Sequence, residues 1–284
     1  MTDSTIRNVS DTALWVAHYR ALESARPDAL FRDPFAARLA GPRGPAIDAA
    51  LKDGRTIAKA IAVRTATIDA LVDEAVHVRK VDMVVNFAAG LDSRPWRMKL
   101  PAELHWVDVD LPGILDYKLQ LLADETPACR YEAIRADLTQ PGVLHDVVTR
   151  LSASGRRVLV ITEGLLVYLK AEEVAAIGRA FHTAASFQWW ISDLAGPLLL
   201  RYIARSHGSA LQNAPMQFAP AEGTAFFTPL GWKEVRFHST GLEARRLGRP
   251  MPRDWLFRLF SLITPTKKLR ELERMSGVVL FERT

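Results

Sequence analysis

Short apolar segments rich in β-branched residues alternate with helical segments through the middle of the chain. Helical patterns cover about 111–123, 142–152 and 171–185, between segments that read as strands. Strands that alternate with helices form βαβ units, in which parallel strands build one sheet with helices on its faces. This alternation therefore predicts an α/β fold. The five expected strands are 81–87, 103–110, 130–137, 156–164 and 188–194.

Two further strand segments lie near the end of the chain, at 232–238 and 277–283. They bring the expected sheet to seven strands, one more than the six of a typical dinucleotide-binding sheet. The first 80 residues read as helical, with helix starts at Asp11 and at Asp33 before Pro34. A seven-stranded sheet with a helical N-terminal region is therefore the predicted architecture.

The segment 196–230 is too long for a simple crossover between strands, and we expect it to form a helical cap inserted before the sixth strand. Such a cap, with the N-terminal helices, would close a pocket at the carboxyl ends of the strands. We expect one compact unit. Its parts are an N-terminal helical region (1–80), an α/β core (81–195), a substrate cap (196–230) and C-terminal strands that complete the core (231–284).

Composition and charge exclude several classes of protein. Among 284 residues Cys129 is the single cysteine, so neither an intramolecular disulfide nor a cysteine-based zinc site is expected, and no metal site is. The net charge of +5 is dispersed without a basic run, which argues against a nucleic-acid partner and suits an anionic small substrate. No signal peptide or apolar stretch of about 18 residues is evident, so we expect no membrane partner and a cytoplasmic location.

The segment NFAAGLDSRPWRM (86–98), directly after the first strand, is a candidate ligand-binding turn. Gly90 falls at the strand-to-helix turn, where the missing side chain lets the backbone approach a ligand. The pattern G-x-G-x-x-G is not met, because Ala88 stands where its first glycine would be and Asp92 follows Gly90 by two. The turn alone also fits an ordinary tight connection, but the broken pattern disfavours a nicotinamide or flavin dinucleotide site.

Acidic residues stand at the ends of the second, third and fourth strands. Asp110 follows Gly90 by 20 residues, and a carboxylate there can accept hydrogen bonds from both hydroxyls of a ribose. Asp137 can accept from an adenine amino group while Leu138 packs on the ring. Glu163 ends the central strand, where a carboxylate suits a ligand better than stability. Asp110 and Asp137 would also suit the capping of the helices that follow them, and the residues alone leave this open.

Seven segments occur in an order and spacing that resemble the leucine carboxyl methyltransferase family. They are NVSDTALWVAHYRA, FRDPFA, AVRTATIDALV, NFAAGLDSRPWR, WVDVDLP, ADL and ITEGLLVYL. The resemblance covers about residues 8–195 well and the rest loosely, with Gly231-Trp232 as its clearest later point. It implies a Rossmann-like class I methyltransferase fold. It also implies S-adenosyl-L-methionine as cofactor and S-adenosyl-L-homocysteine as product.

The resemblance further implies contacts between individual residues and the cofactor. Arg20 would add a second contact near the cofactor or the substrate carboxylate. The family's usual glycine is replaced by Ala88, which would crowd the loop and affect cofactor affinity. The implied contacts are Arg64 at the methionine carboxylate, Gly90 along the cofactor, Asp110 at the ribose, Asp137 and Leu138 at the adenine, and Glu163 at the methionyl ammonium.

Methyl transfer from a sulfonium is an in-line displacement in which positioning supplies most of the rate, so no covalent catalytic residue is expected. A carboxylate acceptor, with a pKa of about 4, is already ionised and needs no general base, whereas a phenol or alcohol needs one. His18 and His207 are the only histidines in the expected cap elements, and no histidine–acid pair is evident. We therefore expect O-methylation of a small acidic molecule, with a phenolic or hydroxyl acceptor as the alternative.

Tyr19 and Arg20, with Tyr202 or Arg201, are expected to orient the acceptor carboxylate, and Trp15 either lines an apolar substrate pocket or is core. Phe218, Phe226 and Phe227 are expected to contact an apolar acceptor chain. Three other interpretations stay open: a protein C-terminal carboxyl as acceptor, a cofactor-binding protein without catalysis, and, less favoured, a nicotinamide oxidoreductase. The sequence does not indicate an oligomeric state.

Overall fold

The computed structural model describes residues 6–51, 53–153, 156–208, 211–252, 254–261 and 263–284. Its centre is one seven-stranded sheet of order β3-β2-β1-β4-β5-β7-β6. β1 to β5 pair in parallel, whereas β7 runs antiparallel to both β5 and β6. The predicted seven strands and α/β class are confirmed. The strands are β1 Met83–Phe87, β2 His105–Asp110, β3 Arg130–Arg135, β4 Val158–Thr162, β5 Phe187–Ala195, β6 Trp232–Ser239 and β7 Ser276–Arg283.

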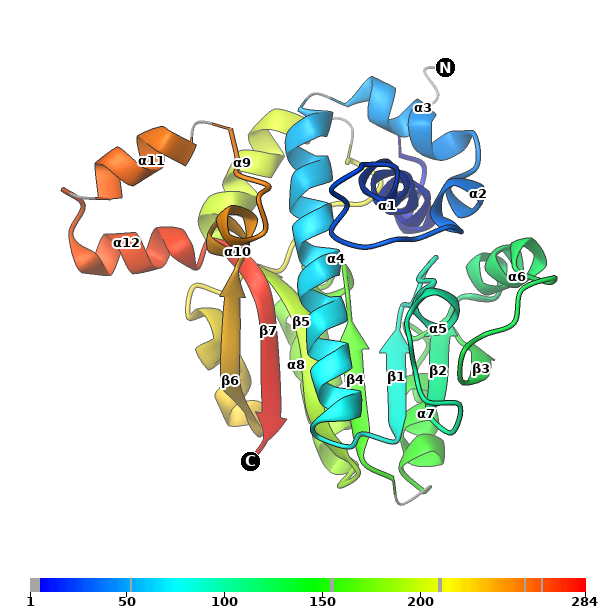
Figure 1. The fold of residues 1–284 in the computed structure, drawn as a ribbon. Coiled ribbons are helices and arrows are strands. Elements are labelled where there is room, and N and C mark those ends of the chain that lie inside the picture. Colours follow the sequence, from blue (N-terminus) through cyan, green and yellow to red (C-terminus); the bar gives the residue numbers. More distant parts are fainter. Residues whose placement is uncertain (1–5, 52, 154–155, 209–210, 253, 262) are drawn as a thin grey trace.

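Helices cover both faces of the sheet and its carboxyl edge (Figure 1). The long helix α4 (Gly54–His77) crosses one face, and α7 (Val143–Ser152) and α8 (Ala171–Thr183) lie on the other. The chain reaches β2 and β4 on opposite sides of β1, so connections diverge there and leave a crevice at the carboxyl ends. α1 (Val9–Ser24), α2 (Ala36–Ala40) and α3 (Arg43–Ala50) lie over that crevice.

The remaining helices connect or flank the strands. α9 (Pro197–His207), α11 (Asp254–Ser261) and α12 (Thr266–Glu273) gather beyond the carboxyl end of β5 and the amino end of β7, on the side away from α1 to α3 (Figure 1). The others are α5 (Arg94–Arg97), α6 (Pro112–Leu121) and α10 (Thr240–Arg246), with the 3-10 turns η1 (Leu166–Tyr168) and η2 (Gly223–Leu230).

Alternate residues of the central strands feed two hydrophobic cores, because successive strand side chains point to opposite faces. Val84 faces the α4 side and packs in one cluster with Leu71 and Val72. Val85 faces the other side and packs in a second cluster with α8 residues such as Phe181 and with Trp190. The strands are buried on both faces, which explains why they read as continuous apolar runs in the sequence.

The phenylalanines of the expected cap belong to this second core. Phe218 and Phe227 are buried in it, and Phe226 packs against it. The ring centroids of Phe227 and Phe281 of β7 are 4.6 Å apart, and those of Phe218 and Phe226 are 5.0 Å apart. The expectation that these three rings contact an acceptor is therefore wrong, because their aromatic faces complete the core.

One local prediction near the start of the chain is corrected, and the structure adds three helices near the other end. Asn8, not Asp11, caps α1: its side chain accepts a hydrogen bond from Asp11 N at 3.1 Å. The Asp11 carboxylate instead pairs with Arg7 and Arg43. α10 to α12 between the last two strands were not predicted; each has only seven or eight residues, and α12 has no fully buried residue.

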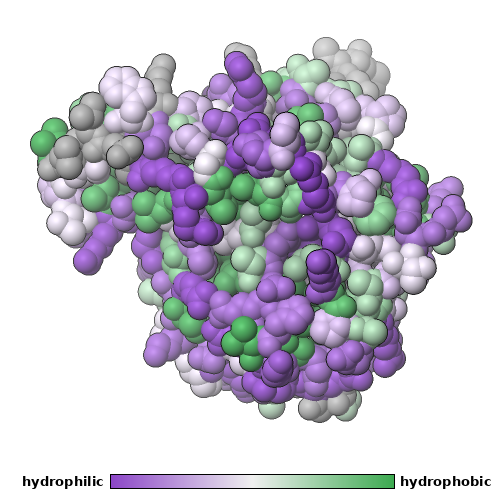
Figure 2. All heavy atoms as spheres, in the orientation of Figure 1, coloured by the Kyte–Doolittle hydropathy of each residue, from purple (hydrophilic) through white to green (hydrophobic). Residues whose placement is uncertain are grey.

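The outer surface is mixed in character. Hydrophilic side chains cover most of the face seen in Figure 2, with apolar patches between them. Within the described residues, no helix combines the length and apolar character that a membrane crossing requires.

A buried ion pair fixes β2 against α6 and the turn that follows β1. Lys118 Nζ lies 2.6 Å from Asp108 Oδ2, and both side chains are fully buried. Lys118 also donates to the backbone oxygen of Asp92. Trp106 and Tyr131 donate to the same Asp108 carboxylate. A buried charge without its partner is costly, so this pair makes the position of the β1 turn depend on α6.

We expect Lys118→Met to lower the free energy of unfolding by about 3–5 kcal/mol, because it leaves the Asp108 carboxylate buried without a counter-charge. The double variant Lys118→Met/Asp108→Asn removes both charges and should recover at least half of that loss. Urea denaturation of the three proteins measures it. A loss below about 1 kcal/mol in the single variant would show that the pair does not hold this region.

Candidate functional site

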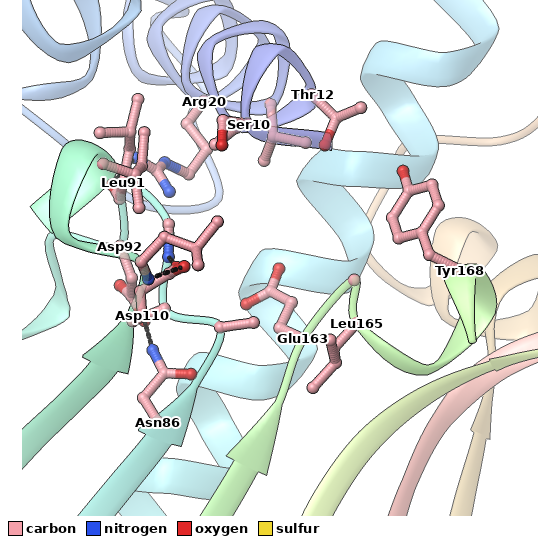
Figure 3. A pocket seen from close by; sticks show the side chains of 18 of the residues that line it. Ser10, Thr12, Arg20, Asn86, Leu91, Asp92, Asp110, Glu163, Leu165 and Tyr168 are labelled. Atoms are coloured by element: carbon pink, nitrogen blue, oxygen red, sulfur yellow. Dashed lines mark hydrogen bonds between the residues drawn. The ribbon is translucent and has the colours of Figure 1, made fainter. Parts of the chain in front are cut away.

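A pocket of about 160 Å³ lies at the carboxyl ends of β1, β2 and β4, under the N-terminal half of α1 (Figure 3). We call it the polar pocket. Glu163 follows β4, and Asp110 ends β2 on the opposite side of the pocket. Arg20 and Thr12 reach it from α1, and Arg64 from α4. The pocket therefore brings together residues that are far apart in the sequence.

The turn after β1 forms one wall of the polar pocket. Ala88 and Gly90 both have positive φ, of 53° and 51°. A Cβ on Gly90 would also come within 3.2 Å of the Ala13 side chain, so the turn needs glycine here for two reasons. Ala88 holds a left-handed conformation that costs a non-glycine residue roughly 1–2 kcal/mol. The glycine position predicted from sequence is thus a tight backbone turn at the pocket.

Asp110 fastens this turn to the end of β2. Its carboxylate accepts from Gly90 N at 2.6 Å and from Leu111 N at 2.7 Å. Burial raises the pKa of Asp110 above its ordinary value, although both N–H groups and Lys118 act in the opposite direction. The carboxylate has room for further donors from the pocket, and such donors would favour its ionised form.

Glu163 lies between two arginines that come from different helices. Its Oε1 accepts from Arg64 Nε at 2.9 Å, and its Oε2 accepts from Arg94 Nη1 at 2.9 Å. Burial by itself would raise the pKa of Glu163, but the charges of Arg94 and Arg64 outweigh it and lower the pKa. Glu163 is therefore a fixed anion in the wall of the polar pocket.

Arg94 also connects Glu163 to two aspartates, one on α4 and one in the turn after β1. Its Nε bonds Asp69 of α4 at 2.7 Å and its Nη1 bonds Asp92 at 2.7 Å. Arg97 bonds both oxygens of Asp69. We call these residues, with Arg64, Glu163 and Asp193, the arginine–carboxylate cluster. It ties α4 and α5 to the carboxyl ends of β1, β4 and β5.

A second, larger cavity of about 280 Å³ adjoins the polar pocket. We call it the apolar cavity, since most of its lining comes from aliphatic and aromatic side chains of α1, α4, α9 and the ends of β5 and β7. Residues that line both spaces are Thr12, Val16, Arg64, Gly164 and Tyr168. Ligands in the two spaces would therefore meet across this shared wall.

Asp193 and Tyr168, which the sequence analysis did not single out, stand at the shared wall or beside it. Asp193 lies near the carboxyl end of β5, and its carboxylate accepts from Arg64 Nη1 at 3.0 Å and from Gly164 N at 2.7 Å. Burial raises the pKa of Tyr168, whose hydroxyl points toward Thr12 in Figure 3. The rule that found Asp110 and Glu163, an acid at the carboxyl end of a parallel strand, would also have found Asp193.

The two residues predicted to contact adenine lie apart from the polar pocket lining. Asp137 follows β3 and is partly buried, and its Oδ1 accepts from Thr139 N and Thr139 Oγ1. Leu138 packs against the core. Both stand close to Asp110, because Ala136 N donates to Asp110 O at 2.8 Å.

The residues predicted to orient an acceptor are divided between the two spaces. Arg20 lines the polar pocket, where it pairs with Asp33 and donates to Leu91 O. Trp15 and Tyr202 line the apolar cavity. Tyr19 is buried and donates to Asp48 Oδ1 at 2.5 Å. Neither Tyr19 nor Arg201 is among the described lining residues of either space.

The expectation that no histidine–acid pair exists is wrong. His18 Nε2 lies 3.5 Å from Asp48 Oδ2, because α3 folds back onto α1. Among the described lining residues, however, no histidine faces the polar pocket or the apolar cavity. No described group of three or more His, Cys, Asp or Glu side chains is arranged to hold a metal ion.

Comparison with known proteins identifies relatives of the whole arrangement. The model of the leucine carboxyl methyltransferase family matches residues 13–182. A protein of Frankia alni provisionally named an S-adenosyl-L-methionine-dependent methyltransferase is 36% identical over 270 residues, which covers 88% of this chain and 93% of that protein. A protein of Streptomyces coelicolor with the same provisional name is 31% identical over 258 residues, covering 84% and 88%.

Solved structures share the fold at low sequence identity. A DUF574 family protein from Streptomyces avermitilis superposes with a TM-score of 0.59 at 14% identity, over 94% of this chain and 97% of that one. A provisionally named methyltransferase from Thermobifida fusca gives a TM-score of 0.57 at 13% identity, over 99% and 97%.

The arginine–carboxylate cluster predicts how the free energy of unfolding of this protein depends on pH. Burial alone would raise the pKa of Asp92, but Arg94, Arg97 and Arg20 lower it to about 2. A carboxyl whose pKa is lowered on folding stabilises the fold above its ordinary pKa, and this contribution is lost as the pH falls from about 4 toward about 2. We expect Asp92→Asn to lose about 2 kcal/mol less stability than the wild type across that interval.

Denaturation at a series of pH values from 6 to 2.5 measures this difference. Asp116→Asn is the matched control, because Asp116 is exposed and pairs only with exposed Arg135 among the described residues. Parallel curves for the wild type and Asp92→Asn would contradict the proposed linkage.

Proposed function

The chain belongs to the leucine carboxyl methyltransferase family, and on this premise we propose that it methylates the carboxylate of a small, largely apolar molecule to a methyl ester. It is an S-adenosyl-L-methionine-dependent methyltransferase with the class I fold, and it leaves S-adenosyl-L-homocysteine as product. The observation that carries the proposal is the wall shared by the two spaces. A methyl donor in one and an acceptor in the other would face each other there, as in-line displacement requires.

The residues of the polar pocket fit the cofactor. Asp110 is a mostly buried carboxylate with a raised pKa, which hydroxyl donors of a ribose would stabilise. Glu163 is an anion suited to the methionyl ammonium. Arg64 uses Nε and Nη1 for Glu163 and Asp193, and no described carboxylate pairs with its Nη2, which suits the methionine carboxylate. When bound, the cofactor supplies an electrophilic methyl group.

The adenine end of the cofactor would lie beyond Asp110. We assign it to Asp137 and Leu138, since both follow the strand next to β2. Arg20 lines the same pocket and is assigned to the cofactor side of the site. Gly90 lets the backbone of the β1 turn approach the bound nucleoside.

A carboxylate acceptor is supported by the groups around the apolar cavity. Such an acceptor is ionised at neutral pH and requires no proton transfer. None of the described lining residues is a histidine, the usual general base at this pH. The protein then contributes by holding the acceptor oxygen toward the shared wall and by excluding water. Trp15 and Tyr202 are the lining residues that we assign to orienting the acceptor.

A hydroxyl acceptor is the second candidate, and Asp193 is the observation that favours it. Its carboxylate lines the apolar cavity next to the shared wall. It could accept the proton of a phenol or alcohol there, which a carboxylate acceptor would not need. The two candidates predict different effects of removing the Asp193 carboxylate, because only a hydroxyl acceptor requires a base.

Calorimetric titration with S-adenosyl-L-methionine tests the cofactor assignment. We expect Asp110→Ala to weaken binding about 10- to 100-fold, because one or two hydrogen bonds to a charged group are lost. The control Asp116→Ala changes an exposed aspartate on α6 and should leave affinity unchanged. Equal affinity of Asp110→Ala and wild type would overturn the assignment.

Transfer of a labelled methyl group to a panel of apolar carboxylic acids and phenols tests the acceptor. A base-labile ester, formed at a rate that stays flat from pH 6 to 8 and persists in Asp193→Asn, supports the carboxylate. A base-stable ether whose formation fails in Asp193→Asn supports the hydroxyl instead. Cofactor binding with no transfer to any acceptor would indicate a binding protein without this activity.

A further inference from the structure

We infer that the apolar cavity takes a monopolar amphiphile, an unbranched apolar body of about ten to twelve carbon atoms whose single polar end is the methylated group. This inference rests on the proposed function, since the cofactor has to occupy the polar pocket. It goes beyond it by giving the size, shape and orientation of the acceptor.

Charge is confined to one end of the apolar cavity. Arg64 and Asp193 are the only charged residues among the described lining, and they pair with each other at 3.0 Å. Elsewhere the described lining carries no charge, and its aliphatic side chains include Ile57, Ile61 and Leu199. A charged group in the middle of a ligand would be buried there without a partner, at high cost. Sugars, nucleotides and free amino acids are therefore poor ligands.

α4 lines the apolar cavity along more than two of its turns. Thr56, Ala60 and Arg64 all line it, and their spacing of four residues places them in one row on the helix. A row from Thr56 to Arg64 is about 12 Å long at 1.5 Å per residue. Such a length suits an unbranched chain lying along the helix, with its polar end at Arg64.

The other end of the row is where the cavity opens. Tyr202 of α9 is 54% exposed and is the most exposed of the described lining residues. Its hydroxyl donates to Asp53 at 3.4 Å, just before the first residue of α4. Leu198, four residues earlier on the same helix, is also exposed. An apolar molecule would enter past Tyr202 with its polar end leading.

The volume of the cavity sets the size of the ligand. An engineered apolar cavity of about 150 Å³ accommodates benzene, with six carbon atoms. The apolar cavity here, at about 280 Å³, is close to twice that size. It therefore accommodates about twelve heavy atoms, in agreement with the length of the row along α4.

Calorimetry with saturated straight-chain carboxylic acids of six to sixteen carbons, in the presence of S-adenosyl-L-homocysteine, tests the inference. Affinity should rise about fourfold with each added methylene until the cavity is full, at about ten to twelve carbons, and then level off. The eight-carbon dicarboxylic acid should bind at least about 30-fold more weakly than the eight-carbon monocarboxylic acid, because its second charge would be buried. Affinity independent of chain length would overturn the inference.

Two variants locate the binding. Ala60→Phe fills the middle of the row and should weaken dodecanoic acid at least tenfold, whereas Ala70→Phe places the same ring on an exposed position of the same helix and should not. Ile57→Ala enlarges the cavity and should move the plateau to longer acids. Unchanged acid binding in Ala60→Phe, or an unmoved plateau in Ile57→Ala, would overturn the inference.

Binding of S-adenosyl-L-homocysteine separates this inference from the proposed function. In Ala60→Phe it should stay within twofold of wild type, which also shows that the variant is folded. If the wild type fails to bind S-adenosyl-L-homocysteine, the proposed function fails, whatever the acids do. If it binds S-adenosyl-L-homocysteine but no apolar acid, only the amphiphile inference fails.

Discussion

Glu163 accepts hydrogen bonds from Arg64 of α4 and Arg94 of α5, and Arg64 in turn pairs with Asp193 near the carboxyl end of β5. These charges are largely removed from water, so each is stable only while its partners stay in place. The cluster therefore holds the carboxyl ends of three strands and two helices in one arrangement. Both ligand spaces depend on it, because Arg64 belongs to the wall between them.

That wall separates two different environments. On one side Asp110, Glu163 and the backbone of the β1 turn offer charge and hydrogen bonds, as a nucleoside with an amino-acid tail requires. On the other side the lining is mostly apolar, which suits a molecule with few polar groups. In the proposed reaction the polar ligand is the cofactor, and the apolar one is the acceptor. Only the reacting ends of the cofactor and the acceptor have to meet at the wall. The transfer then depends on their positioning, and the protein need not form a covalent bond to either.

The strands and much of the polar pocket could be predicted from sequence, because both follow from local patterns. Parallel strands carry continuous apolar runs, and a turn glycine or a strand-end acid such as Gly90 or Asp110 is visible in one segment. Contacts between distant segments were not visible. Arg94 and Glu163 are 69 residues apart, and Arg64 and Asp193 are 129 apart. The same limit explains why the pair of His18 and Asp48 was missed, and why Phe218 and Phe227 were assigned to a ligand when they complete the core.

A crystal structure of the protein with S-adenosyl-L-homocysteine tests the central claim most directly. The account predicts that the ribose hydroxyls bond to Asp110, that the methionyl ammonium lies at Glu163, and that the sulfur faces the apolar cavity across Arg64 and Tyr168. The claim would be contradicted if the nucleoside occupied the apolar cavity, or if the sulfur pointed away from the shared wall.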